Sequence, residues 1–227
     1  ALNLGQPTAF EGSSSQVNTE SAPIAEKVTY YFPERKKMGK VNMPAVEFTW
    51  YDGGLLPDRP KGIPEGKILG DGGGGAMFVG SKGTLICSTY ARDPYIVGRE
   101  NDPPKATNEL RRVETSHEMD WVRACKEDKS SRTEASSHFG YSAPLNEVVV
   151  MGNLAIRLQD LKRKLEWDGA NMKITNIADD EEIRVVSSDK FTVVDGDPRF
   201  DTQYATINAK QAMEEYIKRP YRKGWNY

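Results

Sequence analysis

One stretch of the sequence, residues 143–158, constrains the fold more than any other. It predicts a helix that opens after Ser142, carries Pro144 in its first turn and continues through Leu158. Apolar residues lie on nearly all sides of this helix, so it has no face that suits water. We therefore expect the helix to lie in the interior, packed across one face of a β-sheet.

Four strands are predicted in the first half of the chain. Apolar and polar residues alternate over residues 28–32 and 46–51, which is typical of half-buried strands. The Pro-rich and Gly-containing connection between them, residues 33–44, favours antiparallel pairing. Residues 77–79 and 84–88 flank a short Gly-containing loop and predict a hairpin that joins the same sheet.

Two shorter helices and a second hairpin are predicted elsewhere. One helix begins near Thr115 and ends before Asp128, and the last helix is capped by Asn208 and ends before Pro220. Two alternating runs, residues 183–186 and 191–194, predict a surface hairpin. Strands followed by helices, without regular βαβ alternation, indicate an α+β fold.

The residues alone thus predict antiparallel strands with the long helix packed across one face of the sheet. The length of 227 residues is compatible with one domain over residues 1–227. Cys87 and Cys125 are both expected to be small core residues. The four basic residues between positions 35 and 40 are expected to form a solvated loop.

Composition excludes some classes of partner. The chain has 31 Lys and Arg against 33 Asp and Glu, spread along its length, so we expect neither nucleic acid nor an anionic membrane as a partner. No apolar run approaches the roughly 20 residues of a membrane helix. No signal-peptide pattern opens the chain, but it begins without Met, so both a cytoplasmic and a periplasmic location stay open.

The sequence predicts no cofactor site, metal site or catalytic residue within this chain. The glycines of residues 70–75 precede a strand, whereas a dinucleotide site needs them between a strand and a helix, so we expect a mobile loop. The two histidines and two cysteines have no metal-ligand spacing. The nucleophile motif GxSxG does not occur.

The first candidate substrate contacts are Tyr51 and Asp52, where a strand runs into the Gly53 turn. An aromatic ring and a carboxylate in this position can stack on and hydrogen-bond a sugar-like polyol. The alternative interpretation is structural, with Trp50 in the core and Asp52 as a cap of the turn.

Four further residues are weaker candidates for substrate contact. Tyr90 and Arg92 lie at the exit of the predicted hairpin strand. His117 falls in the first turn of a predicted helix and His138 in a Ser-rich loop. For each of them a structural or solvent-exposed role is the alternative.

Several collinear stretches together resemble one protein family, the C-terminal domain of Gfo/Idh/MocA-type oxidoreductases, in the bacterial branch with an extended C-terminal domain. These stretches cover most of the chain: residues 4–15 (LGQPTAFEGSSS), 48–56 (FTWYDGGLL), 78–90 (FVGSKGTLICSTY), 139–157 (FGYSAPLNEVVVMGNLAIR), 164–176 (KLEWDGANMKITN) and 220–225 (PYRKGW).

The resemblance implies that this chain is a domain built on a large, open, mainly antiparallel sheet with helices packed on one face. It also implies a second, N-terminal Rossmann domain that binds NAD or NADP and is absent from this chain. Members of the family mostly oxidise or reduce sugars and polyols, and one branch cleaves glycosides through a transient NAD-dependent oxidation. The family's Glu-Lys-Pro and Asp-x-x-x-His motifs do not transfer, because Val28 follows Lys27 and Glu134 stands four positions before His138. Both motifs are expected upstream of Ala1. Relative to this branch, residues 177–207 read as a hairpin insertion that covers a pocket, extends an oligomer contact or is inert.

The resulting expectation is a substrate-side and oligomerisation domain of an NAD(P)-dependent sugar or polyol oxidoreductase, inactive in isolation. Its expected partners are the missing Rossmann domain, a sugar-like small molecule and a second copy. The copies are expected to meet through the open sheet face, which so few helices cannot cover and which would remain apolar. The alternatives are a stand-alone binding or assembly module and a part of an NAD-dependent glycosidase.

Overall fold

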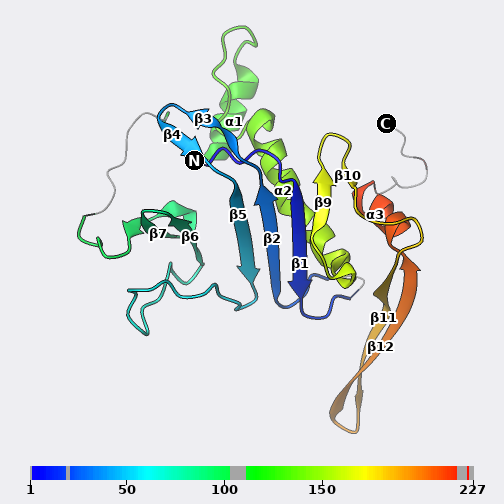
Figure 1. Cartoon of the computed structure of the whole chain (residues 1–227). Coiled ribbons are helices and arrows are strands. Elements are labelled where there is room, and N and C mark those ends of the chain that lie inside the picture. The colour runs from blue at the N-terminus through cyan, green and yellow to red at the C-terminus, as the bar shows by residue number, and fades with distance from the viewer. Residues whose placement is uncertain (1, 19–20, 103–110, 219–223, 225–227) are drawn as a thin grey trace. The chain divides into compact units, whose positions relative to one another are not determined.

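The computed structural model describes residues 2–18, 21–102, 111–218 and 224. The contacts divide the chain into two compact units, which are treated separately below. Unit 1 comprises Ala1–Leu56 and Ser137–Tyr227, and unit 2 comprises Pro57–Ser136. The elements are labelled in Figure 1. That both units belong to one domain stays a prediction.

Unit 1 is built on a five-stranded antiparallel sheet with the order β10-β9-β1-β2-β5. Both predicted strands of this region are confirmed, and they pair directly, with Val28 opposite Trp50 and Tyr30 opposite Phe48. The connection between them forms a small hairpin, β3–β4. The bounds are β1 Ala9–Ser14, β2 Glu26–Phe32, β3 Arg35–Met38, β4 Val41–Met43, β5 Val46–Asp52, β9 Leu165–Asp168 and β10 Lys173–Ile174.

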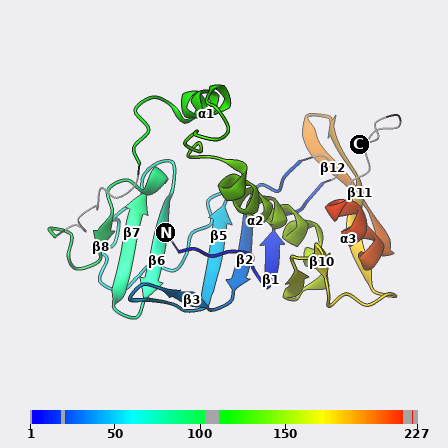
Figure 2. The same cartoon turned by 90° about the horizontal axis from the view of Figure 1, so that it is seen from above.

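Helix α2, Phe139–Arg157, packs across β1 and β2, as expected (Figures 1 and 2). Two glycines permit this close approach. A Cβ on Gly12 would lie 2.9 Å from the backbone carbon of Ala155, and a Cβ on Gly152 would lie 2.8 Å from the Tyr30 hydroxyl. The contact buries Phe10 and Val28 almost completely, and it forms the centre of the core.

The α2 helix differs from the prediction in two respects. It begins earlier, at Phe139, because the His138 carbonyl accepts hydrogen bonds from the backbone N–H groups of Tyr141 and Ser142 and so closes a turn before Pro144. Its burial is also partial. The half from Met151 onward is mostly buried, whereas Leu145 and Val149 are exposed, since β1 and β2 lie beneath only part of the helix.

The α+β class with mostly antiparallel sheets is confirmed, but the helices do not form one layer over the sheet. Helix α3, Ala209–Ile217, packs against α2 and β12. The Asn208 cap is confirmed, because its side-chain oxygen accepts from the Gln211 N–H at 2.9 Å.

The sheet face opposite α2 is polar. Tyr31 donates a hydrogen bond to Glu11 at 2.5 Å, which raises the pKa of Tyr31 to about 12, and the hydroxyls of Thr29 and Thr49 lie 3.2 Å apart. The Lys164 ammonium stands over the Tyr31 ring. The expectation of a dimer through this face assumed that the face is apolar, and it is polar. Dimerisation itself stays a prediction.

A long two-stranded arm, formed by β11 Glu182–Val194 and β12 Asp197–Asn208, extends from unit 1 (Figure 1). The predicted hairpin between residues 183–186 and 191–194 was wrong, because both runs belong to β11. The polar residues between them form a β-bulge at Val186/Ser188 instead of a turn. The chain reverses at Asp195 and Gly196, which have left-handed φ values of 54° and 86°, as a two-residue hairpin turn requires.

Unit 2 holds a separate three-stranded sheet, β6 Gly75–Gly80, β7 Gly83–Ser88 and β8 Tyr95–Ile96. The predicted hairpin is confirmed, but it does not join the main sheet. Helix α1, His117–Lys126, is capped by Ser116, one residue after the predicted cap. Cys87 is buried, whereas Cys125 is exposed, so the prediction of a core position was wrong for Cys125. Within the described residues, no helix is both long and apolar enough to cross a membrane.

Replacing Gly12 with Ala should lower the free energy of unfolding of unit 1 by about 1–3 kcal/mol, because the new methyl group meets backbone atoms of α2 that cannot rotate away. Chemical denaturation followed by circular dichroism measures the change. Gly72→Ala is the matched control, since a Cβ there meets nothing within 4 Å. Equal stability of the two variants would contradict this account of the helix–sheet contact.

Candidate functional site

Unit 1 has a groove of about 1070 Å³ at the base of the β11–β12 arm. It lies among α2, the arm, the end of α3 and the connection between β1 and β2. Its lining combines apolar, aromatic and charged side chains, among them Val150, Met151, Arg157, Asp160, Trp167, Arg184, Val186, Tyr204, Glu215 and Tyr216. We call this surface the groove.

Hydrogen bonds fix the base of the arm beside α2. The Asp160 carboxylate accepts from the backbone N–H of Arg184 at 2.8 Å and so anchors the start of β11. Gln16 donates to the Thr202 hydroxyl at 3.1 Å. The Arg184 guanidinium lies 3.7 Å from the centroid of the Tyr204 ring, which holds both side chains in the wall of the groove. The groove is therefore a fixed feature of unit 1.

The chemistry of the lining suits binding. Among the described residues that line the groove there is no Ser, Cys or His. In the part of the chain that the structure describes, no three His, Cys, Asp or Glu side chains are grouped to hold a metal ion. An apolar floor with a few charged groups is typical of a surface that holds a ligand or a partner.

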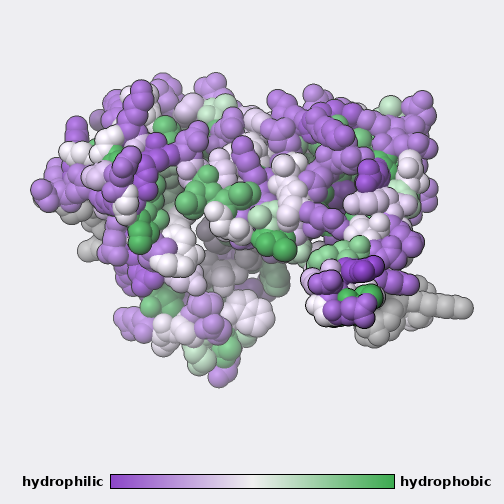
Figure 3. Space-filling view, turned by 90° about the horizontal axis from the view of Figure 1, so that it is seen from below, coloured by the Kyte–Doolittle hydropathy of each residue, from purple (hydrophilic) through white to green (hydrophobic). Residues whose placement is uncertain are grey.

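The arm beyond its base has two unlike faces. Phe191 pairs across the strands with Phe200, their ring centroids 5.3 Å apart, and Val193 pairs with Pro198 on the same face. All four are exposed. The opposite face carries the pairs Lys190–Asp201 and Thr192–Arg199. We call the first of these the apolar face of the arm. The face seen from below in Figure 3 is mainly hydrophilic with separate hydrophobic patches.

Tyr51 and Asp52 lie where the sequence placed them, at the end of the edge strand β5. The Asp52 carboxylate accepts a hydrogen bond from the Gly53 N–H at 2.5 Å and so caps the turn. This is the role that the structural interpretation of Asp52 predicted. Lys27 stands over the Tyr51 ring at 5.7 Å. Trp50 is 52% exposed, so the prediction of a core position was wrong. The reason is that α2 covers β1 and β2 and leaves β5 uncovered.

Tyr90 and Arg92 belong to the loop that leaves β7 in unit 2. Tyr90 is exposed and has a left-handed φ of 59°. Arg92 lies 3.5 Å from Asp71, whose pKa is lowered mainly by a hydrogen bond from the Thr89 hydroxyl. These contacts close the loop onto the turn before β6.

The histidines are placed separately. His117 lies at the start of α1, where its Nε2 is 2.8 Å from the Glu118 carboxylate. His138 stands at the start of α2 in unit 1 and makes no side-chain capping bond. No hydrogen bond or ion pair of the described residues joins any two of the six candidates, and their role as substrate contacts stays a prediction.

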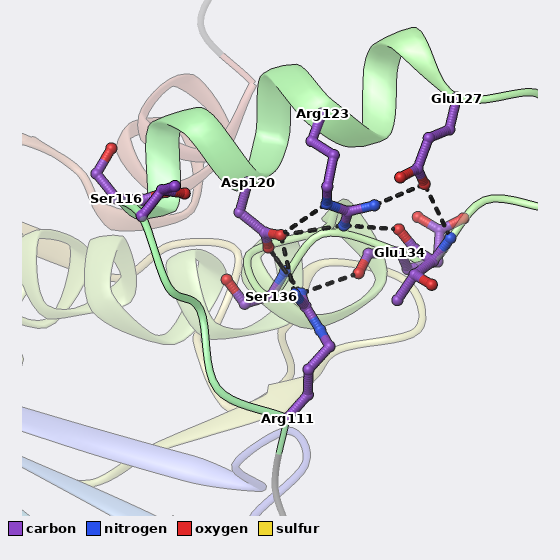
Figure 4. Close-up of polar contacts among 9 residues, drawn as sticks. Arg111, Ser116, Asp120, Arg123, Glu127, Glu134 and Ser136 are labelled. Carbon is purple, nitrogen blue, oxygen red and sulfur yellow. Dashed lines mark hydrogen bonds and ion pairs between the residues drawn. The ribbon is translucent and has the colours of Figure 1, made fainter.

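Sequence reasoning missed a buried carboxylate in unit 2, Asp120 (Figure 4). Arg111 binds both of its oxygens, at 3.0 and 2.7 Å, and Arg123 binds Oδ1. The Ser136 N–H donates to Oδ2 at 2.8 Å. The cluster ties α1 to the segments on both sides of it. The spacing of Asp120, Arg123 and Glu127 on one helix was the available signal.

Asp120 should make unit 2 sensitive to acid. The hydrogen bonds from Arg111 and Ser136 hold its pKa well below the usual range, so the ionised form stabilises the fold. That stabilisation is present above the pKa of an unfolded aspartate and is lost as the pH falls through the folded pKa. Asp120→Asn should therefore speed amide exchange in α1 at neutral pH and differ little from wild type in strong acid.

Hydrogen–deuterium exchange of α1 peptides across this pH range measures the effect. Asp102→Asn, which removes an exposed carboxylate of the same unit, is the control and should leave exchange in α1 unchanged. Equal pH dependence of wild type and Asp120→Asn would contradict the role assigned to this carboxylate.

Comparison with known proteins adds no relative: no family profile matches this chain, and no curated protein matches it.

Proposed function

We propose that this chain is the substrate-side and assembly part of a larger NAD(P)-dependent oxidoreductase acting on sugars or polyols. One observation carries the proposal. Three of the stretches that resemble the Gfo/Idh/MocA type coincide with elements that build unit 1: residues 139–157 are helix α2, residues 164–176 contain β9 and β10, and residues 48–56 contain the end of β5 and its turn.

In this proposal a Rossmann domain outside the chain binds NAD or NADP and carries out hydride transfer. The backbone contacts of residues 70–75 support a structural role for these glycines in place of cofactor binding. Asp71 and Gly74 exchange two backbone hydrogen bonds and close a turn that leads into β6. The groove and the apolar face of the arm offer surfaces for assembly. The half-buried Tyr51 and the exposed Asp52, at the end of the edge strand β5, are the proposed sugar contacts in unit 1.

The proposal is tested with the full-length protein encoded by the gene. Incubation with polyols and NAD or NADP should produce reduced nicotinamide, detected by its absorbance, and the present chain alone should bind neither cofactor in calorimetric titration. Cofactor binding by this chain, or a reading frame with no Gly-rich strand-turn-helix upstream, would contradict it. Turnover of aryl glycosides in place of polyols would assign the chain to the glycosidase branch.

Asp52→Asn in the full-length enzyme should raise KM for the polyol about tenfold and change kcat little, because a charged acceptor is lost while asparagine still caps the turn. Glu47→Gln, at an exposed position of the same strand, is the control. An unchanged KM in Asp52→Asn would show that Asp52 caps the turn and does not contact the substrate. Steady-state kinetics with both variants decides.

A further inference from the structure

We propose that the β11–β12 arm is the contact between two copies of this chain, with the tip of each arm seated in the groove of the other copy. The inference deepens the assembly part of the proposed function and does not depend on the oxidoreductase part. Its starting point is that an isolated two-stranded hairpin is at best marginally stable in water, so an arm with one exposed apolar face gains from a cover.

The surface is complementary to itself. At the tip the apolar face is exposed, with Phe191 and Phe200 at its centre. Toward the base the same side of the arm carries the polar pair Asp189–Thr202 and then Val186 and Tyr204, which line the concave groove together with residues of α2 and α3. An exposed apolar tip and a partly apolar hollow therefore occur on one side of each arm, separated by one polar pair.

The length of the arm fits a reciprocal arrangement. From Val186 to Val194 the strand rises roughly 26 Å, at about 3.3 Å per residue. When two equal arms lie side by side in opposite directions, each tip reaches the base of the other. A two-fold axis relates the copies, so the contact closes as a dimer and does not propagate.

Charge supports the same alignment. Arg184 lies at the base of the arm, on the apolar face, and its guanidinium forms no ion pair within the described ranges. Asp195 occupies the turn at the tip. Antiparallel arms bring Asp195 of one copy to the level of Arg184 of the other, and the symmetry makes this pair twice.

The area is of the order that a dimer needs. Four aromatic residues of this surface are partly exposed: Phe191 at 61%, Phe200 at 71%, Tyr204 at 46% and Tyr216 at 41%. At roughly 200 Å² per aromatic side chain they offer about 440 Å² per copy, or about 900 Å² per pair. Val193, Pro198 and Val150 extend the contact toward the range of about 1,200–2,000 Å² that is typical of stable interfaces.

Sedimentation velocity of this chain at micromolar concentration tests the inference. The wild type should be a dimer, and the double variant Phe191→Asp with Phe200→Asp should raise the dissociation constant about 100-fold or more, because charges enter the centre of the contact. The control is Thr192→Asp with Gln203→Asp, which adds the same charge on the opposite face of the arm and should remain dimeric. Circular dichroism should show unchanged folding in both.

The outcomes separate the two proposals. A monomeric wild type would overturn both this inference and the assembly part of the proposed function. A dimer that survives the Phe191→Asp and Phe200→Asp changes would overturn the arm contact alone and indicate another surface, such as the polar sheet face. Arg184→Gln and Asp195→Asn should each weaken the dimer about tenfold and, combined, no more than either alone; additive effects would overturn the antiparallel alignment.

Discussion

The close approach of α2 to β1 and β2 is the contact on which the rest of unit 1 depends. Gly12 and Gly152 remove the side chains that would hold the helix off the sheet, so Phe10, Val28 and Ala155 become almost completely buried. Packing at this density is the main source of stability for a helix that is otherwise only a run of apolar residues. The remaining elements of unit 1 are arranged around this contact.

The same contact also decides what stays exposed. Because α2 lies over β1 and β2, the edge strand β5 presents Trp50 to solvent, and the first half of α2 presents Leu145 and Val149. On the face of the sheet opposite α2, polar side chains form hydrogen bonds with one another, such as the one that Tyr31 donates to Glu11. Exposed apolar side chains therefore occur on the helix side of the sheet and on the arm, where assembly is proposed.

Local sequence patterns predicted the strands and helices better than they predicted which of these elements contact one another. The alternation over residues 28–32, the Asn208 cap and the β6–β7 hairpin depend on neighbours in sequence, and all are observed. The arm was predicted with the wrong turn, because the polar residues after Val186 resemble a turn and only the register with β12 shows that they form a bulge. The Asp120 cluster was missed because two of its partners lie outside the helix.

The sequence by itself determined the α+β class, two strands of the main sheet, β2 and β5, and the need to bury one long apolar helix, since each depends on periodicity within a short window. Only the tertiary structure decided that β6 and β7 form a sheet apart from the main one, that Trp50 is exposed, and that the arm's apolar face lies on the same side of the arm as the groove. These features depend on which surfaces meet across large separations in the chain, and the free energy of such contacts comes from burial and shape that no local pattern encodes.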